Sequence, residues 1–220
     1  MAYVNGSGHQ LYDNFWAEPN TTLINYVMPS GQTWVPSSNP TGSEPKIVSG
    51  AYVQEYTEAA TSASYLFADI GGDVGYMEAQ FEFGSEGSTN GGALGLIIWQ
   101  STHVTQSPCH LACTEDSYIY SVINADGFVT LQTVNYAEAI SLQYVNVTLN
   151  KTTGTATVTG ADGNVTEITN SSIASISGSY PGPEIYYGHS NTDYRISVYE
   201  FAADTVGYRG GAPQDGRHTR

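Results

Sequence analysis

The stretch Gly75-Tyr76-Met77-Glu78-Ala79-Gln80-Phe81-Glu82-Phe83 decides the fold class of this chain. Apolar and polar residues alternate through it without a break, which is the pattern of a β-strand with one buried face. The apolar face carries Met77, Ala79, Phe81 and Phe83. The polar face carries Tyr76, Glu78, Gln80 and Glu82. We therefore predict a strand over residues 75–83 that turns a polar row away from the core.

Outward from this strand, turn signals recur about every 8 to 12 residues, which is the spacing of a β-sandwich or barrel. Asn124-Ala125-Asp126-Gly127 is a strong hairpin turn between two such segments. The expected strands are 93–99, 118–124, 128–134, 142–149, 155–159, 165–168, 185–187 and 195–201. No segment has convincing helical periodicity, and residues 55–63 come nearest to a short helix. We predict an all-β chain.

The length and composition fit one domain with a real core. The chain has 220 residues, of which 40% are hydrophobic and only 12% charged. Residues 203–220 are polar and poor in apolar side chains. The first segment of the chain, within residues 1–20, is rich in Gly, Asn and Ser. We predict an amino-terminal arm over 1–20, a sandwich over 21–202 and a flexible tail over 203–220.

The charge balance excludes several classes of protein. Six Lys and Arg residues stand against 21 Asp and Glu residues, for a net charge of −15. This disfavours a nucleic-acid binder, which needs a basic footprint. The longest apolar run, 93–99, is far shorter than the roughly 20 residues of a membrane span. The first residues lack the basic and apolar regions of a signal peptide, so we expect none.

The order of the predicted elements resembles the concanavalin A-like lectin/glucanase sandwich in its laminin-G-like form. The resemblance is carried by 76–83, 92–99, 118–120 with the turn at 124–127, 145–149, 155–159 and 194–201. Asp13-Asn14-Phe15, with Trp34, also resembles the start of such domains in minor tail proteins of tailed phages. The resemblance implies a two-sheet antiparallel jelly roll.

The same resemblance implies a virion surface protein of a tailed phage, most simply a minor tail protein that binds a glycan of the host surface. Its partners would be that glycan, other virion proteins and further copies of itself in the particle. It would be assembled in the host cytoplasm and exposed on the virion. The alternatives are a capsid decoration protein, or a secreted carbohydrate-binding lectin or glycosidase.

Glycosidases on this sandwich use a Glu-x-Asp-x-x-Glu strand motif, and the chain lacks it. The nearest substitute is Glu78 with Glu82 on one strand face. Four residues of strand separate their Cα atoms by about 13 Å. Glycosidase carboxyl groups lie about 5.5 Å apart in retaining enzymes and roughly 6.5–9.5 Å apart in inverting ones. We therefore expect a domain without catalysis.

The surplus of tyrosine is the feature most suggestive of binding. The chain has 17 Tyr residues, and Tyr rings stack on sugars and dominate interfaces. The alternative for any single Tyr is packing in the core. The predicted carbohydrate-binding residues are Tyr76, Glu78, Gln80, Glu82, Tyr118, Tyr120, Tyr186 and Tyr187.

Two acidic pairs are candidate calcium ligands, because lectin-like sandwiches often bind calcium through loop carboxylates and carbonyls. They are Asp69 with Asp73, and Glu115 with Asp116. The alternative is ordinary Asp-Gly turn chemistry.

The two cysteines, Cys109 and Cys113, lie in a segment that we expect to be a long loop. A local disulfide that pins the loop is the first candidate, favoured if the protein works outside cells. Two free thiols are the second. Zinc is a third, with His103 and His110 nearby, but these spacings match no common zinc module.

Overall fold

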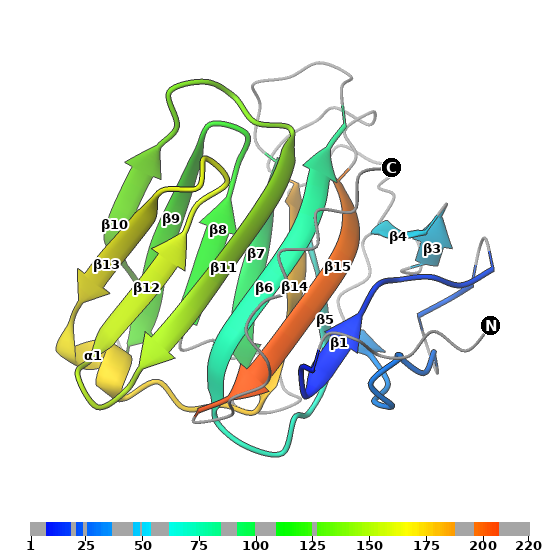
Figure 1. Ribbon diagram of the computed structural model, residues 1–220, viewed down its shortest axis with the longest axis horizontal. Coiled ribbons are helices and arrows are strands. Elements are labelled where there is room, and N and C mark those ends of the chain that lie inside the picture. Colours follow the sequence, from blue (N-terminus) through cyan, green and yellow to red (C-terminus); the bar gives the residue numbers. More distant parts are fainter. Residues whose placement is uncertain are drawn as a thin grey trace.

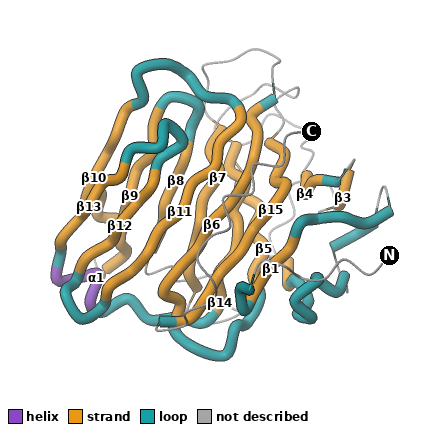
Figure 2. Tube along the Cα trace, in the orientation of Figure 1, coloured by secondary structure: helices purple, strands orange, loops and turns teal. Residues whose placement is uncertain are grey.

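The computed structural model describes residues 8–18, 21–23, 26–36, 46–48, 50–53, 62–84, 92–99, 109–124, 127–187 and 196–206. These residues form two antiparallel sheets packed face to face (Figure 1). The prediction of an all-β two-sheet antiparallel sandwich is therefore confirmed. The only helix in the described part of the chain is α1 (Ser171–Ala174), the purple segment in Figure 2.

The first sheet lies in front in Figure 1 and has β6 near its middle. Its strands are, in spatial order, β13 (Val165–Thr169), β12 (Thr155–Thr159), β11 (Leu142–Asn150), β6 (Val74–Phe83), β15 (Ile196–Thr205), β4 (Ala51–Val53) and β3 (Lys46–Val48), with β1 (Leu11–Asp13) also paired to β15. The central β6 pairs with β11 on one side and with β15 on the other. Side chains from three strands can therefore meet on its outer face.

The second sheet lies behind the first. Its strands are, in spatial order, β10 (Gly127–Asn135), β9 (Ser117–Asn124), β8 (Cys109–Cys113), β7 (Gly92–Trp99), β14 (Tyr180–Tyr187), β5 (Ser62–Phe67) and β2 (Val35–Pro36). The inward side chains of both sheets form one large core, to which Met77, Phe81, Leu96, Leu111 and Val147 belong. The period-2 alternation of β6 is confirmed, since its inward residues are buried and its outward residues half-buried.

The structure corrects several predicted boundaries. Residues 109–113, expected in a loop, form strand β8. The sandwich does not end at residue 202, because β15 continues to Thr205. The expected arm contains β1, which is a strand of the first sheet. Of residues 55–63, expected to come nearest to a helix, 55–61 lie outside the described residues, and β5 begins at Ser62.

A buried carboxylate, that of Asp13, holds the first described segment of the chain in place by hydrogen bonds. The side chain of Asp13 is fully buried and accepts hydrogen bonds from Trp34 Nε1 at 2.5 Å, the Phe15 amide at 2.7 Å and the Tyr26 hydroxyl at 3.3 Å. Phe15 has a φ of 48°, which is uncommon for a residue with a side chain. Burial raises the pKa of Asp13 to about 6, although all three hydrogen bonds act to lower it. Asp13 thus ties β1 to the chain that follows it.

Candidate functional site

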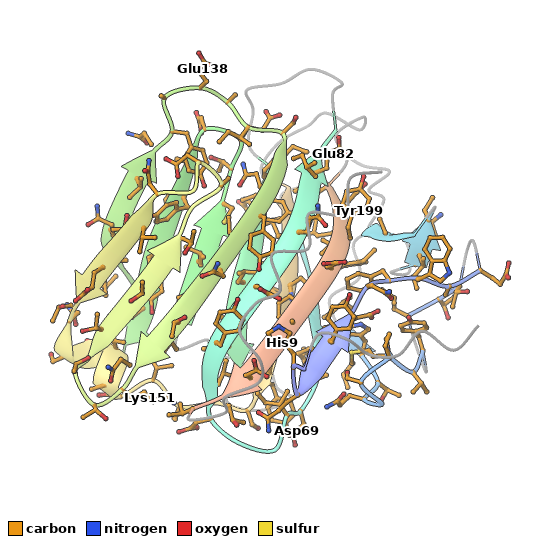
Figure 3. All side chains as sticks on the ribbon, in the orientation of Figure 1. His9, Asp69, Glu82, Glu138, Lys151 and Tyr199 are labelled. Carbon is orange, nitrogen blue, oxygen red and sulfur yellow. The ribbon has the colours of Figure 1, made fainter. Side chains whose placement is uncertain are left out.

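The polar row predicted on residues 76–82 lies on the outer face of the first sheet. Tyr76, Glu78, Gln80 and Glu82 are all half-buried there. Neighbouring strands add Tyr144 from β11 and Tyr199 from β15. We call these six side chains, together with His9, the β6 face; its members Glu82, Tyr199 and His9 are labelled in Figure 3.

Glu78 contacts three other members of the β6 face. Its Oε2 accepts a hydrogen bond from the Tyr76 hydroxyl at 2.6 Å and another from the Tyr144 hydroxyl. Its Oε1 lies 3.2 Å from His9 Nε2. Burial works against the charge of Glu78, but the bonds from His9, Tyr144 and Tyr76 outweigh it and lower the pKa of the carboxyl. Glu78 is therefore an ionised acceptor in a fixed orientation.

His9 is a member of this site that sequence reasoning missed. Its Nδ1 lies 2.6 Å from Asp204 Oδ2, and its ring stacks on Tyr76 with centroids 5.7 Å apart. Burial alone would lower the pKa of His9, but the bonds to Asp204 and Glu78 raise it to about 9. The ring is therefore an imidazolium at neutral pH, with both nitrogens donating. Its sequence context, a Gly- and Ser-rich lead-in, gives no local signal of this role.

The rest of the β6 face pairs tyrosine hydroxyls with carboxylates. Tyr199 donates to Glu82 Oε2 at 2.6 Å. Tyr12 donates to Glu200 Oε1 at 3.4 Å, beside the face. Tyr144 leaves 43% of its surface exposed, more than any other Tyr among the described side chains. A ring held at its hydroxyl and open on its side is suited to stack on a sugar ring.

The arrangement is poorly suited to glycoside hydrolysis. A general acid needs a raised pKa, whereas the pKa of Glu78 is lowered. Glu82 lies four residues along the same strand, and its carboxylate is engaged by Tyr199. What the β6 face offers is oriented acceptors beside an exposed aromatic ring, which is a set of groups for holding hydroxyls.

The predicted tyrosines divide between core and surface. Tyr118 and Tyr120 are 1% and 0% exposed and belong to the core, so their prediction as sugar-binding residues is wrong. Both faces of β9 carry apolar residues, so alternation does not show which face is buried. The structure buries the face with Tyr118, Tyr120 and Val122. Tyr186 is 36% exposed, on the outer face of the second sheet. The side chain of Tyr187 lies outside the described residues.

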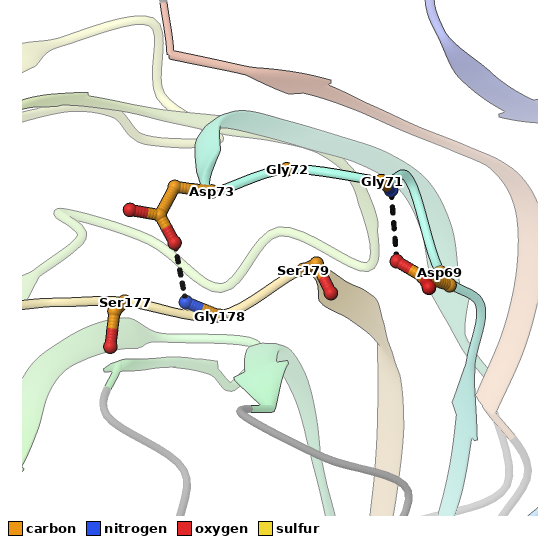
Figure 4. Close-up of a pocket in the computed structure, with 7 residues that line it drawn as sticks. All are labelled: Asp69, Gly71, Gly72, Asp73, Ser177, Gly178 and Ser179. Carbon is orange, nitrogen blue, oxygen red and sulfur yellow. Dashed lines mark hydrogen bonds between the residues drawn. The ribbon is translucent and has the colours of Figure 1, made fainter.

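Asp69 and Asp73 do line one groove, with a volume of about 600 Å³, between the β5–β6 loop and the segment that leads into β14 (Figure 4). Asp69 accepts a hydrogen bond from the Gly71 amide at 2.8 Å, and Asp73 accepts one from the Gly178 amide at 3.0 Å. Lys151 Nζ lies 3.1 Å from Asp73 Oδ2. Burial acts to raise the pKa of Asp73, but the Gly178 amide and Lys151 outweigh it and lower that pKa. An ammonium group thus already balances one carboxylate of this groove.

Glu115 and Asp116 form the turn between β8 and β9, away from that groove. Their carbonyls accept the amides of Ile140 and Tyr136, near Glu138 at one end of the sandwich, while Asp69 and Lys151 lie at the other (Figure 3). The Asp116 carboxylate accepts the Thr114 hydroxyl at 2.7 Å, as in ordinary turn chemistry. Among the residues that the structure describes, no group of three His, Cys, Asp or Glu side chains is placed to hold a metal ion.

The predicted disulfide is wrong. Cys109 and Cys113 are free thiols, both buried in the core on the inward face of β8. Four residues of strand hold their Cα atoms about 13 Å apart, beyond the roughly 7 Å limit for a disulfide. Cys109 Sγ donates instead to the Tyr120 hydroxyl at 3.3 Å. Burial raises the pKa of both thiols, to about 12 for Cys109.

The described part of the chain contains no helix long and apolar enough to cross a membrane. In sequence, no family model and no curated protein matches the chain.

Comparison of structures, by contrast, finds clear likenesses. A structure described in connection with endo-acting O-glycanases that members of the human gut microbiota express to initiate mucin breakdown aligns with a TM-score of 0.60 at 10% identity, covering 90% of this chain and 99% of that one. The carbohydrate recognition domain of Emp47p aligns with a TM-score of 0.56 at 14% identity, covering 85% and 94%. The carbohydrate-binding module CBM66 from Bacillus subtilis aligns with a TM-score of 0.53 at 9% identity, covering 78% and 93%. The chain therefore has the concanavalin A-like lectin fold.

Proposed function

We propose that this chain is a carbohydrate-binding domain without catalytic activity, and that its β6 face holds the sugar. The observation that carries the proposal is the exposed ring of Tyr144, whose hydroxyl is fixed on Glu78. A sugar stacked on that ring would find the Glu78 and Glu82 carboxylates, already oriented by Tyr and His donors, as acceptors for its hydroxyls. Charge-assisted hydrogen bonds of this kind are about twice as strong as neutral ones.

The structural neighbours support a carbohydrate ligand, since they include a carbohydrate recognition domain, a carbohydrate-binding module and a structure described in connection with O-glycanases. Binding without hydrolysis is supported by the lowered pKa of Glu78 and by its wide spacing along β6 from Glu82. The face would act as a platform and leave the glycosidic bond intact.

The test begins with a glycan array and proceeds to calorimetric titration of the strongest hit. Tyr144→Ala should weaken binding about tenfold, because an aromatic stacking contact contributes about 1 kcal/mol beyond its buried area. Tyr144→Phe keeps the ring and should retain most of the affinity. Val165→Ala, at an exposed residue of the distant β13, is the matched control. Unchanged binding by Tyr144→Ala would remove the β6 face from the proposal.

Two further assays use the same ligand. Prolonged incubation followed by chromatography of the sugar should give no product, and a shortened oligosaccharide would overturn the non-catalytic part of the proposal. Repeating the titration with calcium and with a chelator tests calcium binding at Asp69 and Asp73, which stays a prediction.

The biological setting is a separate part of the proposal. The sequence resemblance supports a virion surface protein of a tailed phage that binds a host glycan. The neighbours named above are described as carbohydrate-binding proteins or in connection with carbohydrate-active enzymes. They favour a lectin-like role over a purely structural one. Genes for tail proteins beside this one would support the phage setting, and a gene product with a secretion signal would support a secreted lectin.

A further inference from the structure

The outer face of the second sheet, on the opposite side of the sandwich from the β6 face, carries a pair of polar side chains in close contact. His110 Nε2 on β8 lies 3.0 Å from Glu184 Oε2 on β14. The two strands are not neighbours, because β7 runs between them. The pair therefore crosses over the backbone of a whole strand.

Gly95 makes this crossing possible. It lies on β7 opposite Glu184, and a Cβ atom there would come within 2.6 Å of His110 Nε2 and 2.7 Å of Glu184 Oε2. Glycine in the interior of a strand weakens the strand, and it often marks a place where another group approaches closely. The side chains of His110 and Glu184 lean into the space that Gly95 leaves.

Stability alone is a weak reason for this arrangement. The Glu184 side chain is only 9% exposed, and the net gain from one buried hydrogen bond is small, since both groups give up hydrogen bonds to water. Departures from local folding rules in the middle of a regular sheet are expected at functional sites. The same surface carries Tyr186, two residues along β14 from Glu184 and 36% exposed.

The pair belongs to a polar row that crosses the strands. Thr130 on β10 lies opposite Ser121 on β9, and their hydroxyls are 3.4 Å apart. Ser121 lies opposite His110, and Glu184 lies opposite Tyr65 on β5. Hydroxyl, imidazole, carboxylate and phenol groups thus follow one another from β10 to β5, with a shift of two residues at β7, where Ile97 lies opposite His110 and Gly95 lies opposite Glu184. Adjacent strands are about 4.8 Å apart, which is close to the length that one pyranose ring adds to an extended sugar chain.

We propose that this row is a second glycan-binding site, which takes an extended neutral polysaccharide lying across the strands. Tyr186 stacks on one sugar ring, and His110, oriented by Glu184, bonds to hydroxyls of the chain. The net charge of −15 repels polyanionic glycans and leaves neutral ones as the ligand class. One domain then binds two polysaccharide segments on opposite faces, which extends the proposed function from a monovalent to a bivalent module.

The test uses native gels cast with mixed-linkage β-glucan, galactomannan or arabinoxylan, in which binding slows the protein. In the gel that retards the native protein, Tyr186→Ala and Tyr144→Ala should each weaken retardation about tenfold, and the double variant should run as in a gel without polysaccharide. Tyr186→Phe keeps the ring and should behave as the native protein. Tyr186 is exposed, so its variants should melt as the native protein does, while Tyr144→Ala also loses the hydrogen bond to Glu78 and should melt slightly lower.

The outcomes separate the two proposals. If Tyr144→Ala abolishes retardation and Tyr186→Ala changes nothing, the second site is overturned and the β6 face stands. If Tyr186→Ala alone abolishes it, the second site stands and the β6 face falls. A double variant that is still fully retarded overturns both. A native protein that none of the three polysaccharides slows overturns the second site, while the β6 face is judged by the glycan array. As a second readout, dynamic light scattering should show that the native protein, taken from a monomeric fraction of size-exclusion chromatography, cross-links the polysaccharide into larger particles, and that neither single variant does.

Discussion

The imidazole of His9 reaches Glu78 across the outer face of the first sheet, with Nε2 3.2 Å from Oε1. The other ring nitrogen meets Asp204 at 2.6 Å. One cation thus joins the lead-in to β6 and β15 and fixes the central carboxylate of the β6 face. This contact should make stability depend on pH.

His9→Gln should lower the free energy of unfolding by about 2 kcal/mol at neutral pH, a figure reduced for partial solvent exposure. The pKa of His9 is raised from 6.5 to about 9 in the folded chain. Its contribution is therefore complete below pH 6.5 and is lost as pH rises through 9. Glu78 has a lowered pKa and contributes above 4.5, its ordinary value. Urea unfolding at several pH values should show that the difference in unfolding free energy between native protein and variant narrows as pH rises from 6.5 through 9, and again below pH 4.5. A difference that stays constant with pH would contradict the ion pair.

Asp13→Ala should destabilise the fold by about 3 kcal/mol, because it leaves the Trp34, Phe15 and Tyr26 donors without an acceptor. The native carboxyl should also give a pH dependence of its own. Its pKa is raised from 3.8 to about 6, so its stabilising contribution is complete below 3.8 and is lost as pH rises through 6. Comparing unfolding of native protein and Asp13→Asn between pH 4 and 7 measures this, since the amide does not titrate.

Gly95→Ala should cost about 1–3 kcal/mol, the usual cost of forcing extra atoms into a packed site. The new methyl group would meet His110 and Glu184 at distances below 3 Å. In the double variant Gly95→Ala with His110→Ala, much of this cost should disappear, because one of the two crowded side chains is gone. Thermal unfolding of the four proteins of this cycle gives the coupling, and additive effects would mean that the pair does not lie over Gly95.

Cys109 and Cys113 should not react with a thiol reagent in the folded protein. Both are buried, and their raised pKa values leave almost no thiolate at neutral pH. Two thiols should be counted after unfolding in the absence of reductant. A count of zero in the unfolded, unreduced chain would reveal a disulfide and contradict the placement of both residues on β8.

Strand positions could be predicted from the sequence where a single strand carries a clear alternation of apolar and polar residues. β6 and β11–β13 were predicted closely, because their apolar residues alternate and their turns carry Gly or Asp. β8 was missed because Pro108 and the two nearby cysteines are typical of a loop closed by a local disulfide. The polar row on β6 could be predicted, since one strand supplies all of it. His9, Tyr144 and the His110–Glu184 pair could not be placed, because each depends on which strands become neighbours, and that is settled by the packing of the whole sheet.

The position of β15 has a consequence for how the chain is made. This strand comes last in chain order among the described strands, yet it lies between β6 on one side and β4 and β1 on the other. The early strands β1 and β4 have no partner across that gap until residues 196–205 emerge. On the ribosome, the edge of β6 that β15 will cover therefore stays open, and such an edge can pair with other chains. The first sheet can close only after β15 has emerged, and nascent chains crowded on one messenger RNA would be most exposed to mispairing just before that point.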